Sequence, residues 1–576
     1  MTKPGFCDIL TIKTALLRER VLKMEKIEFF LASSLEKVFP TIRPEPLGGG
    51  VLSAWAGMRA AVQLVYRAPG GAGGSLVQKY RAAVHGAPEA AELFAVELVP
   101  SDFPCWEAAG KDDNYLTKEP GLFPDLLKPL QNGEFRPVPR QYRSIWISLP
   151  VSREAVPGNY PVTIEVRPVG DGETVRLTFV LRVGRCRLGD QKLIHTEWFH
   201  ADCLASYYRV EPLSEAHWEI LERFIWDAGR RHGVNMLLTP VFTPPLDTEV
   251  GGERPTVQLV GVRKSGGKYS FDFTDLERWT RICRENGIRY LEIAHFFTQW
   301  GAHATPKIMA EADGKLQRIF GWDVPADSPA YREFLEAFVP ALRAALERFG
   351  FDREHVYFHI SDEPSEKNLD SYLAAKRQVI DLLEGCPVVD ALSSFQFYQQ
   401  GIVQRPIPAN DHIQPFFDAN VPDLWVYYCC VQGTDVPNRF YAMPSARNRI
   451  MGVLMYLYKI RGFLHWGYNF YYTQFSRALA DPFAMTHAGY AFPSGDPYLV
   501  YPGENGEPWT SIRAEVQSEA LADLRALEAL ERKAGRDETV RIIRGGRPEP
   551  FTFRQYPKDA AYLLELRERI FDALEA

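Results

Sequence analysis

The sequence predicts an α/β protein in which a (β/α)8 (TIM) barrel follows an N-terminal β-sandwich domain and precedes a C-terminal helical appendage. Up to about residue 190, short runs that alternate apolar and polar residues are separated by Pro and Gly. Beyond that point, short apolar runs alternate with amphipathic helical stretches. The first pattern is typical of antiparallel sheets, and the second of parallel strands joined by helices. We expect an extension over 1–24 that could be disordered, the sandwich over 25–188, the barrel over 189–508 and the helical segment over 509–576.

The N-terminal half carries the alternation that antiparallel strands need. Turn signals such as Gly170-Asp171-Gly172 separate the runs, and residues of these types favour tight turns. The predicted strands of the sandwich are 51–56, 60–66, 142–149, 160–166 and 174–183.

The second half predicts eight strands with helices between several of them. The strand-like runs are 193–198, 234–240, 288–294, 355–360, 388–392, 424–429, 462–466 and 498–501. The helical stretches are 214–232, 276–286, 328–349, 368–383 and 446–460. Glycine closes several helices, as at Gly287 and Gly350, which is the usual residue just after a helix C-terminus. A doubly wound sheet is the alternative, but no G-x-G-x-x-G follows an early strand.

The composition of the chain argues against some classes of binding partner. The 576-residue chain has a formal net charge of −7, and no basic stripe is present to displace the counterions of a nucleic acid. No apolar run reaches the ~18–20 residues of a membrane span, and the first residues lack a signal-peptide cleavage site. We therefore expect a cytoplasmic protein without a nucleic-acid or membrane partner. An exposed face of the sandwich could support a homodimer.

Neither a metal nor a cofactor is predicted. The eight cysteines are scattered and form no CxxC pair. Five histidines fall near predicted strand ends: His195, His200, His295, His359 and His465. The spacing of His195 and His200 does not fit the His-x-His of barrel metallohydrolases, so hydrogen bonding or core packing is the preferred interpretation.

The adjacent carboxylates Asp362 and Glu363 are the candidate catalytic residues. In a barrel, reactive side chains lie where strands end, and His359–Pro364 (HISDEP) marks such an end. Two neighbouring carboxylates raise one another's pKa, which keeps one protonated as a general acid requires. Pro364 is expected to hold Glu363 extended and to stop strand pairing there. An acidic helix N-terminus, stabilised by the helix dipole, is the structural alternative.

Geometry then limits the mechanism. Two-carboxylate glycosidases place their carboxyl groups on opposite sides of the sugar ring, about 5–5.5 Å apart for retention and 6.5–9.5 Å for inversion. Adjacent residues on one strand reach a substrate from one side. Either another strand supplies a second carboxylate, or a 2-acetamido group of the substrate acts as nucleophile. The candidates for the second carboxylate are Glu197, Asp202, Glu292 and Asp435.

Several segments together resemble glycoside hydrolase family 123. They are WFHADCLA (198–205), YLTKEPGLFPDLL (115–127), HISDEP (359–364), LWVYYCC (424–430) and FLHWGYNFYY (463–472). The resemblance covers most of the chain. It implies a retaining exo-β-N-acetylgalactosaminidase that acts on an oligosaccharide or glycoconjugate by substrate-assisted catalysis through an oxazoline.

The resemblance also implies residue roles. Asp362 would orient the acetamido group and Glu363 would be the general acid/base. Tyr427 or Tyr428 would bond the acetamido carbonyl, and Trp466 would form a pocket wall. From their places at strand ends, Trp198, His200, His295 and Asn469 complete the candidate substrate-binding set. Two other functions stay open: a two-carboxylate retaining glycosidase for another sugar, and a non-catalytic carbohydrate-binding barrel.

Overall fold

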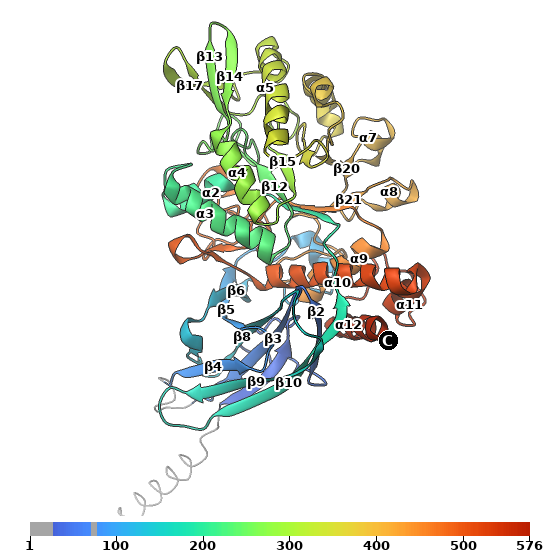
Figure 1. The fold of residues 1–576 in the computed structure, drawn as a ribbon. Coiled ribbons are helices and arrows are strands. Elements are labelled where there is room, and N and C mark those ends of the chain that lie inside the picture. Colours follow the sequence, from blue (N-terminus) through green and yellow to red (C-terminus); the bar gives the residue numbers. More distant parts are fainter. Residues whose placement is uncertain (1–26, 71–77) are drawn as a thin grey trace, which may run out of the picture.

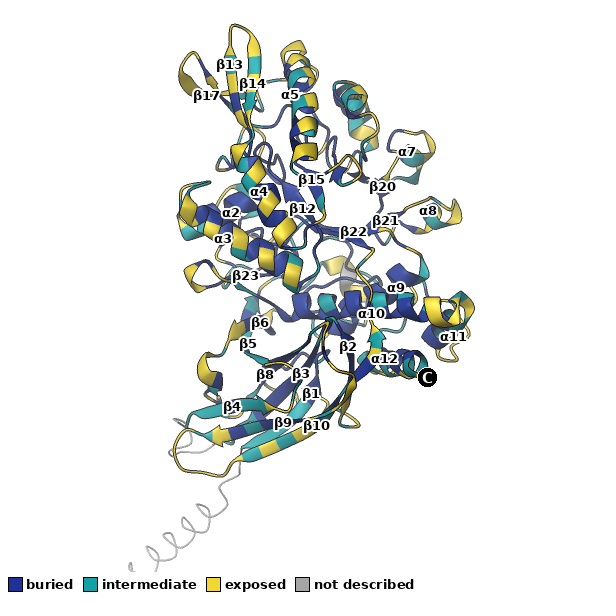
Figure 2. Ribbon diagram, viewed as in Figure 1, coloured by how far each residue is buried: buried dark blue, intermediate teal, exposed yellow. Residues whose placement is uncertain are grey.

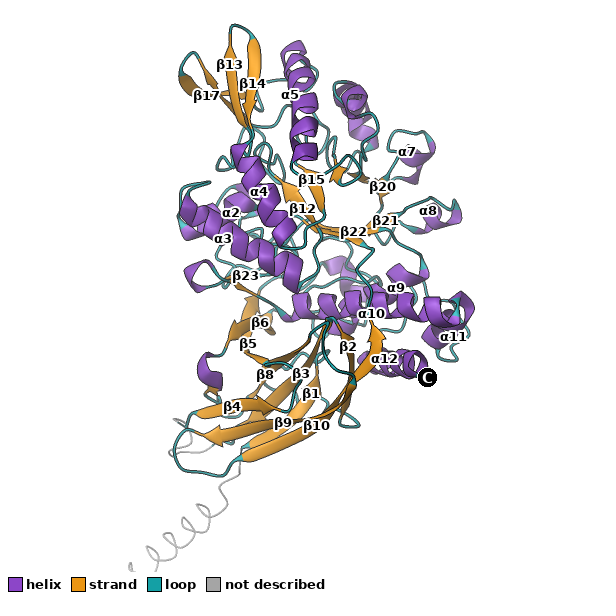
Figure 3. Ribbon diagram, in the orientation of Figure 1, coloured by secondary structure: helices purple, strands orange, loops and turns teal. Residues whose placement is uncertain are grey.

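The computed structural model describes residues 27–70 and 78–576. The predicted extension over 1–24 lies outside the described residues. A β-rich region forms one end of the molecule, a parallel sheet flanked by helices forms the other, and helix α10 (Ile512–Ala534) runs between them (Figure 1). The helices and strands are distinguished in Figure 3.

The N-terminal region contains two five-stranded sheets. The first has the order β1-β3-β8-β5-β6 and is antiparallel throughout, and the second has the order β2-β10-β9-β4-β7 with one parallel pair, β2 and β10. Apolar side chains of both sheets, including the fully buried Trp55 and Trp146, belong to one hydrophobic cluster, as a sandwich requires. The bounds are β1 (Glu28–Ser33), β2 (Val51–Ala56), β3 (Met58–Arg67), β4 (Tyr80–His85), β5 (Glu92–Ser101), β6 (Gly121–Pro129), β7 (Glu134–Phe135), β8 (Tyr142–Val151), β9 (Gly158–Pro168) and β10 (Val175–Arg187).

A six-stranded parallel sheet supports the second region. Its order is β18-β15-β12-β11-β22-β21, and each of its neighbouring pairs is parallel. The bounds are β11 (Ile194–Glu197), β12 (Met236–Thr239), β15 (Tyr290–Ile293), β18 (Val356–Tyr357), β21 (Trp425–Tyr427) and β22 (Gly462–His465). Every residue of β11, β12 and β22 is buried, because strands covered by helices have no solvent-facing side.

The sheet is a partial barrel rather than the continuous eight-stranded barrel that the sequence predicts. Outside this sheet lies a separate parallel pair, β19 (Asp390–Ala391) and β20 (Pro406–Ile407). Single bridges, Phe358 with Val388 and Ala409 with Tyr427, connect this pair to the two edges of the main sheet. Strands of two residues make too few hydrogen bonds to give a continuous ladder.

The predicted eighth strand is wrong. Of residues 498–501, only Tyr501 enters a strand, β23 (Tyr501–Pro502), and this strand pairs antiparallel with β24 (Pro508–Trp509). The run 498–501 is apolar because it is buried in the core, and an apolar run does not reveal whether a strand pairs. Strand β20 was missed because its Pro and its length give no strand signal.

A small sheet of order β14-β13-β16-β17 projects beside α5, at the end of the molecule opposite to the β-rich region (Figure 1). Its strands are β13 (Gly261–Ser265), β14 (Lys268–Asp272), β16 (Ile308–Ala312) and β17 (Lys315–Phe320).

The helices begin where the sequence supplies caps. The hydroxyl of Ser328 accepts the backbone N–H of Tyr331 at the start of α5, and the Asp559 carboxylate accepts that of Tyr562 at α12. Such a cap contributes about 1 kcal/mol to the stability of a helix. After α5, Gly350 takes φ +89°, a backbone conformation that suits glycine. The bounds are α2 (Ala201–Tyr208), α3 (Glu215–Trp226), α4 (Thr274–Glu285), α5 (Pro329–Arg348), α6 (Leu369–Arg377), α7 (Phe395–Gln399), α8 (Gln414–Asp418), α9 (Ser445–Leu457), α11 (Arg536–Arg544) and α12 (Ala560–Glu575).

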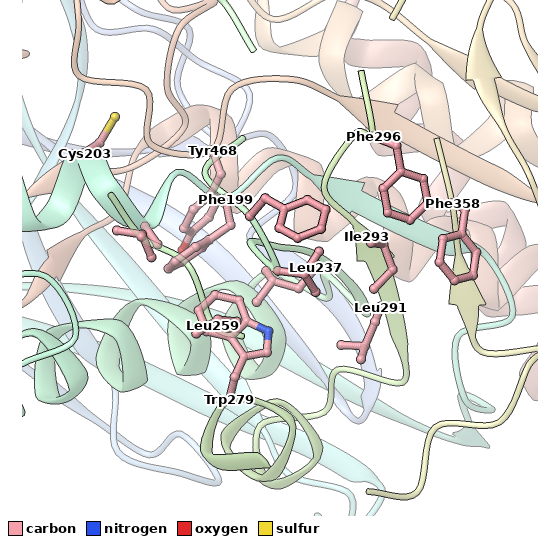
Figure 4. Close-up of a cluster of buried hydrophobic side chains, with 14 of the residues drawn as sticks. Phe199, Cys203, Leu237, Leu259, Trp279, Leu291, Ile293, Phe296, Phe358 and Tyr468 are labelled. Atoms are coloured by element: carbon pink, nitrogen blue, oxygen red, sulfur yellow. The ribbon is translucent and has the colours of Figure 1, made fainter. Parts of the chain in front are cut away.

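One hydrophobic cluster joins the parallel sheet to the helices that cover it (Figure 4). Leu237 of β12 and Leu291 of β15 pack in this cluster with Trp279 of α4, and all three side chains are fully buried. Burying a Leu side chain contributes about 1.5–3 kcal/mol. This packing holds the strand ends, and the loops that follow them, in fixed positions.

Helix α10 is a buried element rather than a peripheral appendage (Figure 2). Its Gln517 donates to Glu197 Oε1 of β11 at 2.7 Å. Its Asp523 accepts from Arg449 Nε of α9 at 2.8 Å and from Arg567 Nε of α12 at 2.9 Å. Charged groups are buried at this site only because they are paired.

No helix within the described ranges combines the length and the apolar character that crossing a bilayer demands.

Replacing Asp523 by Asn removes the charge that neutralises two buried guanidinium groups. We expect Asp523→Asn to lower the free energy of unfolding by about 3–5 kcal/mol, the usual effect of breaking a buried ion pair. Urea denaturation followed by tryptophan fluorescence measures the change. The matched control is Asp537→Asn, at an exposed position of α11, which should change stability by no more than about 0.5 kcal/mol. Equal stability of both variants would contradict the assignment.

Candidate active site

A pocket with a volume of about 120 Å³ opens among the loops that follow the parallel strands. Asp362 and Glu363 follow β18, Gln299 and Trp300 follow β15, and Asp247 lies in the loop after β12. Carboxyl ends of parallel strands are the usual place for a ligand site in such folds. The lining residues are Trp198, His200, Leu246, Asp247, Gln299, Trp300, Asp362, Glu363, Ala391, Tyr427, Cys429, Leu464, Trp466, Gln474 and Phe492.

Six of the nine residues that the sequence singled out line this pocket. They are Asp362, Glu363, Trp198, His200, Tyr427 and Trp466. The structure does not place His295, Tyr428 or Asn469 in its lining.

The Asp-Glu pair lies in an irregular segment after β18. Asp362 is half-buried and Glu363 is exposed. Glu363 has φ 46°, so the expectation that Pro364 holds it extended is wrong. Strand β18 already ends at Tyr357, and pairing therefore stops before the Pro can act. A left-handed non-glycine residue costs about 1–3 kcal/mol and persists where surrounding contacts fix it, often at functional sites.

Burial raises the pKa of Asp362 well above its usual range, and the neighbouring Glu363 charge raises it further. Asp390 and Glu292 act in the same direction. Ionising Asp362 beside Glu363 is therefore costly, and Asp362 keeps its proton to a higher pH than a free carboxylic acid does. This is the condition that a general acid needs.

Tyr427, in β21, contacts Glu363 directly. Its hydroxyl donates a hydrogen bond to Glu363 Oε1 at 2.8 Å. Burial, followed by the Glu363 charge, raises the pKa of Tyr427 well above its usual value. The phenol thus stays protonated and fixes one oxygen of the Glu363 carboxylate.

Glu292 of β15 fixes the orientation of Trp198, which forms a wall of the pocket. This fully buried carboxylate accepts Trp198 Nε1 at 2.8 Å, His359 Nε2 at 2.6 Å and Thr196 Oγ1 at 2.5 Å. Three donors satisfy the oxygens of the buried group. The indole of Trp198 therefore has one fixed orientation at the pocket.

His200 is held as a neutral ring. Its Nδ1 accepts from Arg254 Nη2 at 3.1 Å, so Nε2 carries the proton and donates to the Trp466 carbonyl at 3.0 Å. Burial and the Arg254 charge lower the pKa of His200 to about 3. Asn469 acts behind this ring: its amide accepts the His200 backbone N–H at 2.8 Å and donates to the His200 carbonyl at 3.1 Å. Asn469 positions His200 and does not face the pocket.

Trp466, after β22, forms another wall. Its Nε1 donates to Asp496 Oδ2 at 2.8 Å, and its ring centroid lies 4.9 Å from that of Phe492. The indole is half-buried, so part of its surface faces the cavity.

His295 and Tyr428 lie in the protein interior. His295 stacks on His359 with ring centroids 4.3 Å apart, and burial lowers its pKa well below the usual value. Tyr428 packs against Phe463 at 5.1 Å, on the side of β21 opposite to Tyr427, because successive side chains of a strand alternate in direction.

None of the four carboxylates proposed as a second acid lines the pocket. Glu197 forms an ion pair with Arg439 at 2.7 Å, Asp202 with Arg254 at 2.7 Å, and Asp435 with Lys558 at 2.8 Å. Glu292 is occupied by the three donors described above. Each has a structural partner that accounts for it.

Sequence reasoning missed Asp247, Gln299, Trp300 and Gln474. Gln299 and Trp300 lie in the loop that follows the predicted strand 288–294. A position soon after a strand end was a usable signal for them. Asp247 lies seven residues after Pro240 in a long irregular loop, where no pattern marks it. Within the described residues, no cluster of three or more His, Cys, Asp or Glu side chains could hold a metal ion.

Comparison with known proteins places this chain among glycosidases. The profile "Glycoside hydrolase 123, catalytic domain" matches residues 198–530. A structure of a family 123 glycoside hydrolase from Clostridium perfringens aligns with a TM-score of 0.68 at 14% identity, covering 96% of this chain and 97% of that one. No curated protein matches the sequence.

Two further solved structures align over large parts of the chain at low TM-scores. They are a putative alpha-galactosidase from Bacteroides fragilis (TM-score 0.25, 9% identity, 85% of this chain and 80% of that chain) and a β-glucuronidase from Parabacteroides merdae (TM-score 0.24, 11% identity, 76% and 47%). Since the family profile spans more than half of the sequence, the protein belongs to glycoside hydrolase family 123 and is a glycosidase.

Proposed function

We propose that the protein is a retaining exo-glycoside hydrolase that releases β-linked N-acetylgalactosamine by substrate-assisted catalysis. The observation that carries this proposal is the placement of Asp362 and Glu363, consecutive residues of one loop, at one pocket. Neighbours on one loop approach the anomeric carbon from one direction. The group that attacks from the other face then comes from the substrate.

In the first step, Glu363 donates its proton to the glycosidic oxygen, and the bond from this oxygen to the anomeric carbon breaks. The 2-acetamido oxygen forms a new bond to the same carbon and closes an oxazoline ring. Asp362 accepts a hydrogen bond from the acetamido N–H and stabilises the positive charge that develops on the acetamido group. In the second step, Glu363 takes a proton from water, the water oxygen bonds to the anomeric carbon, and the oxazoline opens. Two displacements retain the configuration.

The electrostatics support these roles. The pair shares a proton because burial and mutual repulsion raise the pKa of Asp362. An acetamido N–H that docks on Asp362 favours its ionised form, and the shared proton then resides on Glu363, beside the leaving oxygen. His200 is neutral, so it adds no charge that would ionise the pair prematurely.

The walls suit a pyranose. Trp198 and Trp466 present indole surfaces from two different strand ends, and such surfaces stack on the apolar faces of sugars. Tyr427 is the candidate donor to the acetamido carbonyl, provided that its one hydroxyl proton turns from Glu363 Oε1 to the substrate on binding, and Tyr428, which faces away, is not. The structural relative from Clostridium perfringens was studied for glycolipid glycan hydrolysis, and we extend that substrate class, together with oligosaccharides, to this chain.

A two-carboxylate retaining glycosidase is the second candidate function, because Asp247 brings a third carboxylate to the pocket from a different loop. For the fold, we propose that β19 and β20 complete a closed (β/α)8 barrel with the six-stranded sheet. The single bridges at Phe358–Val388 and Ala409–Tyr427 support this closure.

The first test compares nitrophenyl glycosides of β-GalNAc, β-GlcNAc and β-Gal. Wild type should hydrolyse the 2-acetamido sugars and leave the galactoside intact. Glu363→Gln should lose about 10²–10⁴-fold in kcat, the usual effect of a missing general acid, and Asp362→Asn about 10²–10³-fold. Glu366→Gln, an exposed carboxylate of the same loop, is the matched control and should retain full activity. Efficient galactoside hydrolysis would rule out substrate assistance.

The shared proton makes the rate depend on pH. Because the protonated pair is the active form, kcat/KM should fall as pH rises through the pair's apparent pKa, which lies above that of a free carboxylic acid. Asp362→Asn removes the neighbouring charge that raises this value, and the alkaline limb of its residual activity should move to lower pH. A limb that stays in place would show that Asp362 does not influence the acid.

Tyr427→Phe removes the hydrogen bond to Glu363. This bond stabilises the ionised carboxylate, so its loss should move the alkaline limb to higher pH, opposite to the effect of Asp362→Asn. We also expect kcat to fall about 10-fold, the equivalent of one hydrogen bond to a charged group. Tyr428→Phe is the matched control. An identical pH profile in Tyr427→Phe and wild type would refute the contact's role.

A further inference from the structure

The pocket contains polar groups that the Asp362–Glu363 chemistry does not use. Asp247, Gln299 and Gln474 all line it, and they come from three different loops, after β12, β15 and β22. A pocket that only had to accommodate an acetamido group and a leaving oxygen would not need them.

Asp247 is held rigidly. Its carboxylate Oδ2 accepts the Phe475 backbone N–H at 3.0 Å, and its carbonyl accepts the Ser476 hydroxyl at 2.6 Å. Its own backbone N–H donates to Gln299 Oε1. Asp247, Phe475 and Ser476 have φ values of 40°, 60° and 53°. Such conformations persist only where the surroundings fix them, so this junction has one geometry.

One carboxylate oxygen of Asp247 is available to a ligand. The residue is 8% exposed, and no salt bridge involving it occurs within 27–70 and 78–576. Arg254 lies near enough to favour the ionised form, but burial outweighs it and raises the pKa of Asp247 to about 6. Among the described residues, Oδ1 has no hydrogen-bond donor. A carboxylate oxygen that faces a pocket without a protein donor can accept a hydrogen bond, and a hydroxyl group of a bound sugar would supply the donor.

Gln299 supplies the complementary group. The Oε1 atom of Gln299 accepts the Asp247 N–H. Its Nε2 atom therefore remains able to donate, and no acceptor for this nitrogen occurs in the described part of the chain. A single hydroxyl can donate to Asp247 and accept from Gln299 at once. A linked acceptor and donor of this kind recognises hydroxyl groups and rejects sugars that lack them.

We infer that Asp247 and Gln299 bind a hydroxyl group of the terminal sugar, at carbon 3, 4 or 6, and thereby determine which sugar is cleaved. The inference rests on the proposed function, since Asp362 is taken to occupy the substituent at carbon 2. It also assigns Asp247 a role other than the second carboxylate of the alternative mechanism.

The test is a set of mutant cycles with nitrophenyl β-GalNAc and its 3-, 4- and 6-deoxy derivatives. Asp247→Asn should lower kcat/KM about 10–100-fold on the parent sugar, since a hydrogen bond to a charged group is broken. With wild type, one deoxy derivative should have a kcat/KM that is lower than that of the parent sugar by the same factor. On that derivative, Asp247→Asn should lower kcat/KM by less than about threefold. Gln299→Met removes this donor together with the acceptor of the Asp247 backbone N–H. It should show its smallest loss on the same derivative, and it provides a second cycle if Asp247→Asn fails to fold.

Glu249→Gln is the matched control. Glu249 lies in the same loop, is exposed and pairs with Arg477 at 2.8 Å outside the pocket. We expect its kcat/KM to stay within about threefold of wild type on every substrate.

Two outcomes would overturn the inference. The first is a loss in Asp247→Asn that is the same on all four sugars. The second is a loss above about 10⁴-fold that azide restores by forming a glycosyl azide, because this identifies a nucleophile. If wild type instead prefers a sugar without the acetamido group, the proposed function fails, and the same cycles on that sugar's deoxy derivatives still decide the role of Asp247. If wild type cleaves none of them, calorimetric binding of N-acetylgalactosamine and its deoxy forms replaces kcat/KM in the cycle.

Discussion

The arrangement of the pocket depends on the buried carboxylate of Glu292. A charge inside the protein is tolerated only when its oxygens are hydrogen-bonded, and Glu292 meets this requirement with donors from β11, from Trp198 and from His359. These bonds connect three parallel strand ends beneath the cavity. They fix the Trp198 wall, and the Glu292 charge contributes to the raised pKa of Asp362. One interaction thus links the fold to the protonation of Asp362, a member of the proposed catalytic pair.

Other buried ion pairs extend this support outward. The Arg254–Asp202 pair fixes the guanidinium that, together with burial, keeps His200 neutral, and the Arg439–Glu197 pair connects the loop before α9 to β11. Gln517 of helix α10 accepts a hydrogen bond from Arg439 and so connects α10 to the Arg439–Glu197 pair. Pairs of this kind add little to net stability compared with apolar packing, but breaking one is costly. Their effect here is to hold long loops, which would otherwise move, in a single arrangement around a small cavity.

Several parts of this arrangement could be predicted from residue patterns. Seven of the eight strands that the apolar runs with flanking glycines predicted for the second region occur in the structure, and capping residues marked the helices. The eighth strand was misplaced because residues 498–501 are buried for packing, and burial alone does not distinguish a paired strand from an apolar loop. The Asp-Glu pair stood out as two carboxylates after a strand. His295, Tyr428 and Asn469 also stood at strand ends, but side-chain direction, which only the folded backbone defines, turned them away from the cavity.

The sequence by itself determined the two-part organisation of the chain, the family resemblance and the identity of the paired carboxylates. These are local properties, since periodicity, turn residues and adjacent acids are written in consecutive positions. Tertiary structure alone decided that α10 is buried, that Glu363 takes a left-handed conformation, and that Asp247 and Gln299 meet at the pocket. Each of these depends on contacts between residues far apart in the chain, and the energies of such contacts exceed the local preferences that a sequence reveals.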